Sequence, residues 1–259
     1  MLCRMRLLAV PTLAVAFLAT IVSTAQTPAP APAPAASASI PRYEVRRATS
    51  PVTIDGALDE AAWAAAAPPL TLQFLWDTQT GAKQKTSVRV VWDAQAFYAG
   101  FEADDADITA RFENRDDPTY QDDAVEMFIN PDPRQEVVYY GFEMNAKGVL
   151  YDYLNYNSRT LFKRFDATGV RIATSIRGGG TMNVRTDTDT GWNLEVAVPW
   201  ANFEELSRRP PTAGVVWKAN FNRWDGVQPN RRMSIWSDPQ NTTSWPHVPS
   251  RFGELAFVE

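Results

Sequence analysis

Seven aspartates are crowded into one short stretch of the chain, where their carboxylates could bind a metal ion. They flank two predicted strands and are Asp104, Asp105, Asp107, Asp116, Asp117, Asp122 and Asp123. Oxygen ligands in loops suit Ca²⁺, which accepts roughly six to eight of them with flexible geometry. Their spacing is not that of a helical calcium loop, and a solvated acidic surface is the alternative interpretation.

Aromatic side chains are the second group that could form a binding site. The sequence contains nine Trp, eight Tyr and thirteen Phe, which is more than a core of this size requires when Val, Ile and Leu also fill it. Some of these rings are therefore expected at the surface. An exposed ring can stack on a flat apolar ligand face, and sugars are the commonest such ligand outside the cell.

Several common kinds of enzyme site are excluded by residue type. The single cysteine is Cys3, ahead of the first hydrophobic run, and the single histidine is His247. After cleavage of a signal peptide no thiol remains for nucleophilic, zinc-thiolate or disulfide chemistry. One histidine cannot form a zinc site by itself, and no G-x-S-x-G, phosphate-loop or dinucleotide motif is present.

The N-terminal region predicts export. Arg4 and Arg6 precede an apolar run that ends in Ser23-Thr24-Ala25, which is the pattern of a secretory signal peptide over residues 1–25. Residues 26–40 alternate Pro and Ala and are expected to form a disordered spacer. We therefore expect a secreted or periplasmic protein without a membrane span after cleavage.

The remaining chain, 41–259, is expected to form one acidic domain and to be a monomer. Removing Arg4 and Arg6 reduces the 25 basic side chains to 23 against 30 acidic ones, a net charge of −7. This charge disfavours nucleic acids and anionic membranes as partners.

The sequence of the domain predicts short strands that are separated by polar turns. Apolar residues recur at every second position in 88–92 and 97–101, on either side of a tight turn, and this pattern predicts a hairpin. Two brief helices are expected at 60–66 and 200–206. The sequence therefore predicts an all-β fold, an antiparallel β-sandwich of jelly-roll or immunoglobulin-like type with one or two short helices. Further strands are predicted at 124–130, 137–144, 149–154, 170–176, 182–185, 192–198, 215–223 and 254–258.

Five segments, in this order and spacing, resemble the family 9 carbohydrate-binding modules and their single-domain, DOMON-type relatives. The resemblance implies an antiparallel jelly-roll sandwich that binds glucan or xylan chain ends and supports carbohydrate catabolism beside partner glycosidases. It also implies a structural Ca²⁺, with Asp104, Asp122 and Asp123 as ligands. The segments are IDGALDEAAW (54–63), VVWD with FY (90–93, 97–98), DDAVEMFI (122–129), GWNLEVAVPW (191–200) and HVPSRFGEL (247–255).

The same resemblance implies a sugar clamp made of two rings, Tyr120 and Trp245. Pyranose C–H groups bury apolar area against an aromatic face, while the hydroxyls hydrogen-bond at its edge. Glu126 alternates with core residues and therefore faces away from the core, and the match makes it a sugar contact, as it does Glu143 and Asn145. Two positions depart from the family: Tyr120 replaces a typical tryptophan, and Glu143 stands where sugar binders can carry an arginine.

Three other functions remain open from the sequence. A glycoside hydrolase could use Glu126 with Asp123 or Glu143, although the sequence gives no evidence for the separation that such chemistry requires, and a non-catalytic role is favoured. A haem site with an axial methionine and a lysine or histidine could use Met144 and Lys147, which are expected near the proposed site, and Met233 and His247 are also available. A sandwich that binds protein or envelope polymer, with a decayed sugar site, is the third alternative.

Overall fold

The computed structural model describes residues 39–76, 81–157, 160–162, 164–203 and 210–259 of the chain. Residues Ala38–Glu259 group into one unit. The predicted signal peptide and all but the last two residues of the predicted spacer lie outside the described residues. No helix within the described ranges is long and apolar enough to cross a membrane.

The hairpin predicted from alternating apolar residues is confirmed. Its strands, β3 (Thr86–Trp92) and β4 (Ala96–Asp104), pair antiparallel along the whole of β3. The Asp93 carboxylate closes the turn, since it accepts the backbone N–H groups of Gln95 at 2.7 Å and Ala96 at 2.9 Å. An aspartate at the first turn position commonly acts in this way.

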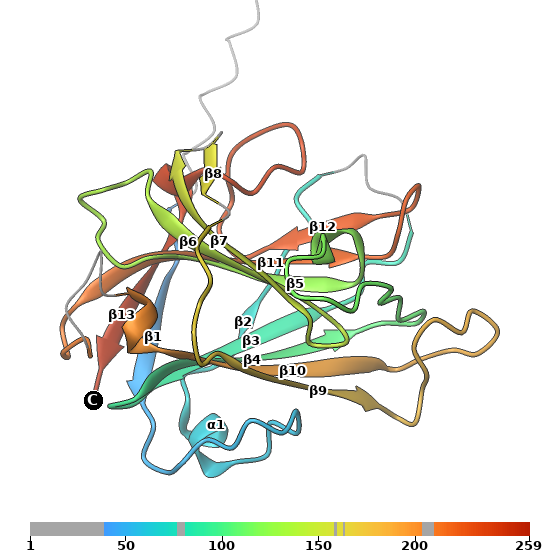
Figure 1. Ribbon diagram of the computed structural model, residues 1–259, viewed down its shortest axis with the longest axis horizontal. Coiled ribbons are helices and arrows are strands. Elements are labelled where there is room, and N and C mark those ends of the chain that lie inside the picture. The colour runs from blue at the N-terminus through green and yellow to red at the C-terminus, as the bar shows by residue number, and fades with distance from the viewer. Residues whose placement is uncertain (1–38, 77–80, 158–159, 163, 204–209) are drawn as a thin grey trace, which may run out of the picture. The chain divides into compact units, whose positions relative to one another are not determined.

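Thirteen strands form one curled sheet whose ends face each other as two layers (Figure 1). The strand order is β8-β7-β6-β5-β11-β13-β1-β3-β4-β10-β9, with β12 on β11 and β2 on β3. The remaining bounds are β1 Arg42–Arg47, β2 Leu70–Thr71, β5 Ala124–Asn130, β6 Tyr139–Asn145, β7 Leu150–Asn157, β8 Thr160–Phe162, β9 Arg171–Arg177, β10 Gly191–Pro199, β11 Val216–Asp225, β12 Arg232–Ile235 and β13 Gly253–Val258.

The two layers enclose an aromatic-rich core. Along β5, Val125, Met127 and Ile129 point between the layers, as the alternation predicted. Trp192 of β10 and Trp217 of β11 are the largest apolar side chains buried there. Residues Glu126 and Phe128 alternate with these and face the other side of β5.

The fold departs from the sequence prediction at several places, and strands β1, β2, β8 and β12 were not predicted. Strand β1 pairs parallel with both β13 and β3, so the sheet is not antiparallel throughout. The predicted strand 182–185 is a turn, because Asn183 has a φ of +63° and its amide pairs with the backbone of Ala110 at 2.8 and 2.9 Å. The second predicted helix is a 3₁₀ turn over Trp200–Phe203, and residues 204–206 lie outside the described residues.

The Asp-Gly turn at the start of the domain has a structural role. The Glu195 carboxylate of β10 accepts the backbone N–H groups of Asp55 and Gly56 and the indole N–H of Trp63, at 2.7–2.9 Å. Gly56 has a φ of +89°, which favours glycine. This contact holds helix α1 (Ala61–Ala65) against the outward side of the β3-β4-β10 layer (Figure 1).

Candidate functional site

A row of polar side chains crosses the outward side of the other layer. Cross-strand register places Asn222, Glu126, Glu143 and Tyr151 opposite one another on β11, β5, β6 and β7 in turn. All four are buried, with at most 5% of their surface exposed. Polar groups in such surroundings are expected to be hydrogen-bonded, and an exception indicates an absent ligand or water.

Glu126 is the centre of this row, and each of its two carboxyl oxygens accepts one hydrogen bond. Its Oε1 accepts the indole N–H of Trp224 at 2.8 Å, and its Oε2 accepts an amide N–H of Asn222 at 3.2 Å. Burial raises the pKa of Glu126 to about 7, and the positive charge of Arg231 offsets part of that effect. The carboxyl therefore exchanges its proton close to neutral pH.

Arg231 brings a cation over this row from the connection between β11 and β12. Its guanidinium carbon lies 3.5 Å from the centre of the Trp224 ring, a stacked cation–π contact. The Nε and Nη2 atoms are buried and have no hydrogen-bond partner, as is also true of Oδ1 of Asn222. Burial lowers the pKa of Arg231 to about 10, so it stays charged at neutral pH.

Glu143 lies next to Glu126 and is held by a tyrosine from β7. The Tyr153 hydroxyl donates to Oε1 of Glu143 at 2.8 Å. The Tyr153 ring lies directly over Gly141, where any Cβ atom would overlap it. Glycine at position 141 is therefore required for the ring to reach Glu143.

Tyrosine rings lie next to the polar row, at its β7 end. Tyr120, in the 3₁₀ turn Thr119–Gln121 before β5, packs edge-on against Tyr151 with ring centres 5.8 Å apart. Tyr151 in turn lies 5.6 Å from Tyr153. Tyr120 is half-buried, so its ring is part of the surface that a ligand over the row would meet.

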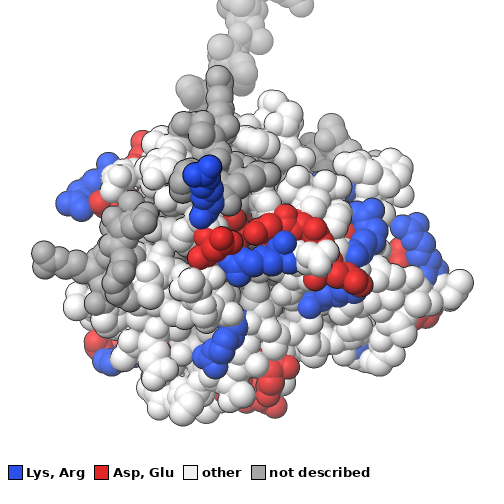
Figure 2. All heavy atoms as spheres, in the orientation of Figure 1, with Lys and Arg blue, Asp and Glu red and all other residues white. Residues whose placement is uncertain are grey.

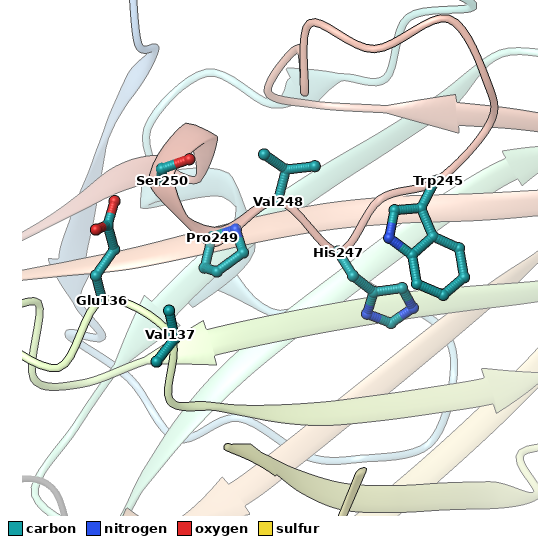
Figure 3. Close-up of a pocket in the computed structure, with 7 residues that line it drawn as sticks. All are labelled: Glu136, Val137, Trp245, His247, Val248, Pro249 and Ser250. Carbon is teal, nitrogen blue, oxygen red and sulfur yellow. The ribbon is translucent and has the colours of Figure 1, made fainter. Parts of the chain in front are cut away.

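Trp245 lines a separate cleft of about 570 Å³ (Figure 3). Half of its surface, 50%, is exposed. Its ring centre lies 4.5 Å from that of His247, which stacks on Phe128 at 4.7 Å. The other residues of the cleft are Glu136, Val137, Val248, Pro249 and Ser250.

His247 lies between the cleft and the sheet, and its ring is neutral. Its Nδ1 is hydrogen-bonded to the Tyr139 hydroxyl at 2.6 Å. Burial lowers its pKa to about 4, so the ring is neutral at physiological pH. Because His247 stacks on Phe128, which lies two residues from Glu126 on the same side of β5, the cleft lies close to the polar row.

The two rings of the predicted clamp contact different neighbours. Tyr120 packs on Tyr151, whereas Trp245 packs on His247, and no ring contact joins the two among the described residues. Tyr120 does not line the cleft around Trp245. The facing pair therefore stays a prediction, and the structure presents two aromatic surfaces beside the polar row.

Asn145, a predicted sugar contact, is used within the fold. Its amide N–H groups are donated to the carbonyl of Phe112 at 3.0 Å and to Asp122 at 3.1 Å. Its Oδ1 accepts the backbone N–H groups of Lys147 and Val149. Every polar atom of the side chain is thus paired inside the protein, and Asn145 shapes the β6–β7 turn.

The three predicted calcium ligands do not converge. Asp104 is exposed and pairs with Arg177 at 2.6 Å. Asp122 accepts two backbone N–H groups, those of Arg111 and Phe112, and the Arg111 guanidinium. Asp123 lies elsewhere, in a buried group with two other aspartates. These residues do not fit a shared Ca²⁺ site.

That buried group consists of Asp105, Asp123 and Asp225, whose oxygens lie within 4.8 Å of one another. The fully buried Arg223 donates to Asp105 at 2.8 Å and pairs with Asp225 at 3.4 Å, and Arg232 adds a contact to Asp225 at 2.9 Å. Burial and the neighbouring Asp105 raise the pKa of Asp123 to about 8. With Asp123 protonated, two guanidinium groups balance two carboxylates.

Calcium binding at this group is therefore expected to contribute little to stability. Since arginines already neutralise its buried aspartates, no excess negative charge there draws in an ion. Melting temperatures measured at neutral pH in excess CaCl₂ and in EDTA should agree. A higher melting temperature in CaCl₂ would instead show that a calcium site contributes to the folded state.

Exposed charges are paired locally as well. On the face shown in Figure 2, acidic and basic side chains lie next to one another in a mixed band. Exposed pairs of this kind include Lys147 with Glu113 at 2.7 Å. Among the residues drawn in colour, this face shows no broad region of a single sign.

Sequence reasoning missed three residues of the polar row and its surroundings. Asn222 and Trp224 alternate with the core residue Phe221 along β11, so the rule applied to Glu126 could have found them. Arg231 lies in a connection with no periodic pattern. Only the folded structure shows that its side chain lies over Trp224.

Comparison with known proteins gives one family and several similar folds. The family model described as carbohydrate family 9 binding domain-like matches residues 54–259. No curated protein matches the chain. A candidate carbohydrate-binding protein from Bacteroides uniformis has a TM-score of 0.67 at 18% identity, covering 85% of this chain and 100% of that one.

Two further structures are of a family 9 carbohydrate-binding module from Caldicellulosiruptor kristjanssonii. The cellotriose complex has a TM-score of 0.58 at 19% identity and covers 83% of this chain and 93% of that one. The glucose complex has a TM-score of 0.58 at 18% identity and covers 84% and 95%. At these identities the likeness establishes the β-sandwich fold.

Proposed function

Because the chain belongs to the carbohydrate family 9 binding domain-like family, we propose that it binds an oligo- or polysaccharide on the outward side of β11, β5, β6 and β7. The ligand lies over the polar row of Asn222, Glu126 and Glu143. The solved complexes of a structural neighbour contain cellotriose and glucose, which supports a glucan among the glucan or xylan chains expected from the family.

The observation that carries this proposal is the set of buried hydrogen-bonding atoms left without partners. Arg231 offers two N–H donors and Asn222 offers one carbonyl acceptor. They belong to one cluster, because Asn222 is hydrogen-bonded to Glu126 and Arg231 stacks on Trp224, which is also hydrogen-bonded to Glu126. Leaving such groups unpaired costs about 1–3 kcal/mol each. A ligand rich in hydroxyl groups, which both donate and accept, satisfies donors and acceptors together.

The aromatic surfaces provide the apolar contacts to the sugar. The exposed indole of Trp245 and the half-buried ring of Tyr120 provide faces on which pyranose C–H groups can pack. We assign Trp245 the larger share, because its ring is bigger and more exposed. Its cleft adjoins the polar row through His247 and Phe128.

Binding is favoured over hydrolysis by the way the two carboxyls are held. Glu126 accepts from Trp224 and Asn222, and Glu143 accepts from Tyr153, so fixed donors orient both groups. A hydrolase needs one carboxyl aimed at the leaving oxygen and another free to attack or to activate water. Incubation with xylan or cellulose should therefore release no soluble sugars.

A haem site that uses Met144 and Lys147 together does not fit the geometry. Met144 lies in the core between the layers, fully buried. Lys147 pairs with Glu113 at 2.7 Å on the surface. These two candidate ligands therefore lie in different parts of the fold, one in the core and one at the surface. The purified protein should show no Soret absorbance.

Export and a role in carbohydrate catabolism complete the proposal. The N-terminal pattern of residues 1–25 supports secretion or periplasmic delivery, where polysaccharide fragments and partner glycosidases are found. Cell fractionation with an antibody against the domain tests this placement. Detection of the uncleaved chain in the cytoplasm alone would contradict it.

Asn222→Ala is expected to weaken saccharide binding about three- to tenfold, because it removes a buried acceptor in contact with the ligand. Isothermal titration calorimetry with xylo-, cello- and manno-oligosaccharides measures the change. The matched control is Asn193→Ala on the opposite layer, which also has an unpaired buried Oδ1. Equal affinity in both variants, or no binding heat from the folded wild type, would contradict the proposal.

A further inference from the structure

The guanidinium of Arg231 is held in one plane before any ligand arrives. It stacks on Trp224 at 3.5 Å from the ring centre, and the Trp224 indole is itself fixed by its 2.8 Å hydrogen bond to Glu126. Both groups lie beside the polar row. The direction in which Arg231 offers its N–H groups is therefore set by the fold.

The two unpaired atoms of Arg231 belong to one edge of the guanidinium. Nε–H and the adjacent N–H of Nη2 point the same way and form a fork, which matches the two oxygens of a carboxylate. Both atoms are buried and lack a hydrogen-bond partner. A single hydroxyl or carbonyl oxygen would satisfy only part of this edge.

The neighbouring carboxyls do not fill the fork. Both oxygens of Glu126 accept from Trp224 and Asn222, and Oε1 of Glu143 accepts from Tyr153. Burial raises the pKa of Glu126 to about 7 and that of Asp123 to about 8. These two acids therefore carry protons for part of the time near neutral pH, and in that fraction they place no negative charge beside Arg231.

We infer that the saccharide bound at this site carries a carboxylate, as a uronic acid does, and that Arg231 binds it through the Nε–Nη2 edge. The inference rests on the proposed saccharide function and narrows its ligand class. The unpaired Oδ1 of Asn222, in the same cluster, accepts a hydroxyl of the same sugar. Bidentate ion-paired contacts of this kind are stronger than neutral hydrogen bonds.

The test compares two probes that differ only at C6, methyl β-glucoside and methyl β-glucuronoside, by calorimetry at pH 7.5. The wild type should bind the glucuronoside at least about tenfold more tightly, as expected for a charge-assisted pair. Arg231→Lys keeps the charge but loses the fork and should lose most of that preference. Arg89→Met, an arginine on the other layer paired with Glu102, should retain it.

The possible results distinguish a failure of the carboxylate assignment from a failure of the proposed saccharide binding. Equal binding of the two probes, or tighter binding of the glucoside, overturns the carboxylate assignment and leaves saccharide binding intact. Unchanged preference in a folded Arg231→Lys overturns the assignment of Arg231. Failure of the oligosaccharide panel and of both probes to bind the folded wild type overturns the proposed function itself. The wild-type comparison needs no variant to fold.

Discussion

Replacing Arg223 by methionine is expected to lower the free energy of unfolding by about 3–5 kcal/mol. The Arg223 side chain is fully buried and pairs with Asp105 and Asp225. Its removal leaves two buried carboxyls beside Asp123 with only Arg232 to compensate. Burial already raises the pKa of Asp105 despite the arginine, so the variant should take up a proton on folding. Urea unfolding monitored by tryptophan fluorescence measures the loss.

Two comparisons separate this effect from simple loss of an ion pair. Arg177→Met breaks a partly exposed pair with Asp104 and should cost less than about 1 kcal/mol. Adding Asp105→Asn to Arg223→Met removes one of the stranded charges and should recover part of the stability. Similar losses for Arg223→Met and Arg177→Met would show that the buried group does not depend on its arginine.

Trp245→Ala is expected to weaken saccharide binding by about 2 kcal/mol, or roughly thirtyfold. The indole is 50% exposed in a cleft of about 570 Å³, so it offers a large apolar face at little conformational cost. Truncation leaves the sugar ring with no flat partner on that side. Calorimetric titration with the oligosaccharide that binds most tightly measures the effect.

The conservative variant Trp245→Phe tests whether stacking causes the loss. It keeps a flat ring and should retain most of the affinity that Trp245→Ala loses. The melting temperature of both variants should stay close to that of the wild type, because half of the side chain is already in water. Full affinity in Trp245→Ala would show that the ligand does not reach the cleft.

Strand positions and the family were accessible from the sequence because their signals are local. A period of two places Val125 and Met127 inside and Glu126 outside, and β5 has the predicted bounds. The family assignment from the five segments is also confirmed, since the family model spans all of them. Strand β1 was not predicted, although Tyr43 and Val45 alternate with charged residues, because only two apolar positions mark it before it pairs with β13 and β3.

The candidate site depends on contacts that no local pattern encodes. Arg231 acquires its role only when the chain turning from β11 to β12 stacks it on Trp224. The aspartate-rich stretch suggested a cation site, but Arg223 enters the interior of the fold and joins Asp105 there. Core positions of a strand usually hold apolar residues, so the alternation along β11 does not predict an arginine there. The spacing of the aspartates therefore could not show which of them pair with this buried arginine.

Nuclear magnetic resonance of the tryptophan indole N–H groups tests the central claim most directly. The nine tryptophans each give one signal, and Trp224 and Trp245 lie at the proposed binding face, whereas Trp63 lies on the opposite layer beneath Glu195. Titration with a binding oligosaccharide should shift the Trp224 and Trp245 signals and leave that of Trp63 unchanged. Shifts at Trp63 with none at Trp224 and Trp245 would contradict the assignment of the saccharide site to this face.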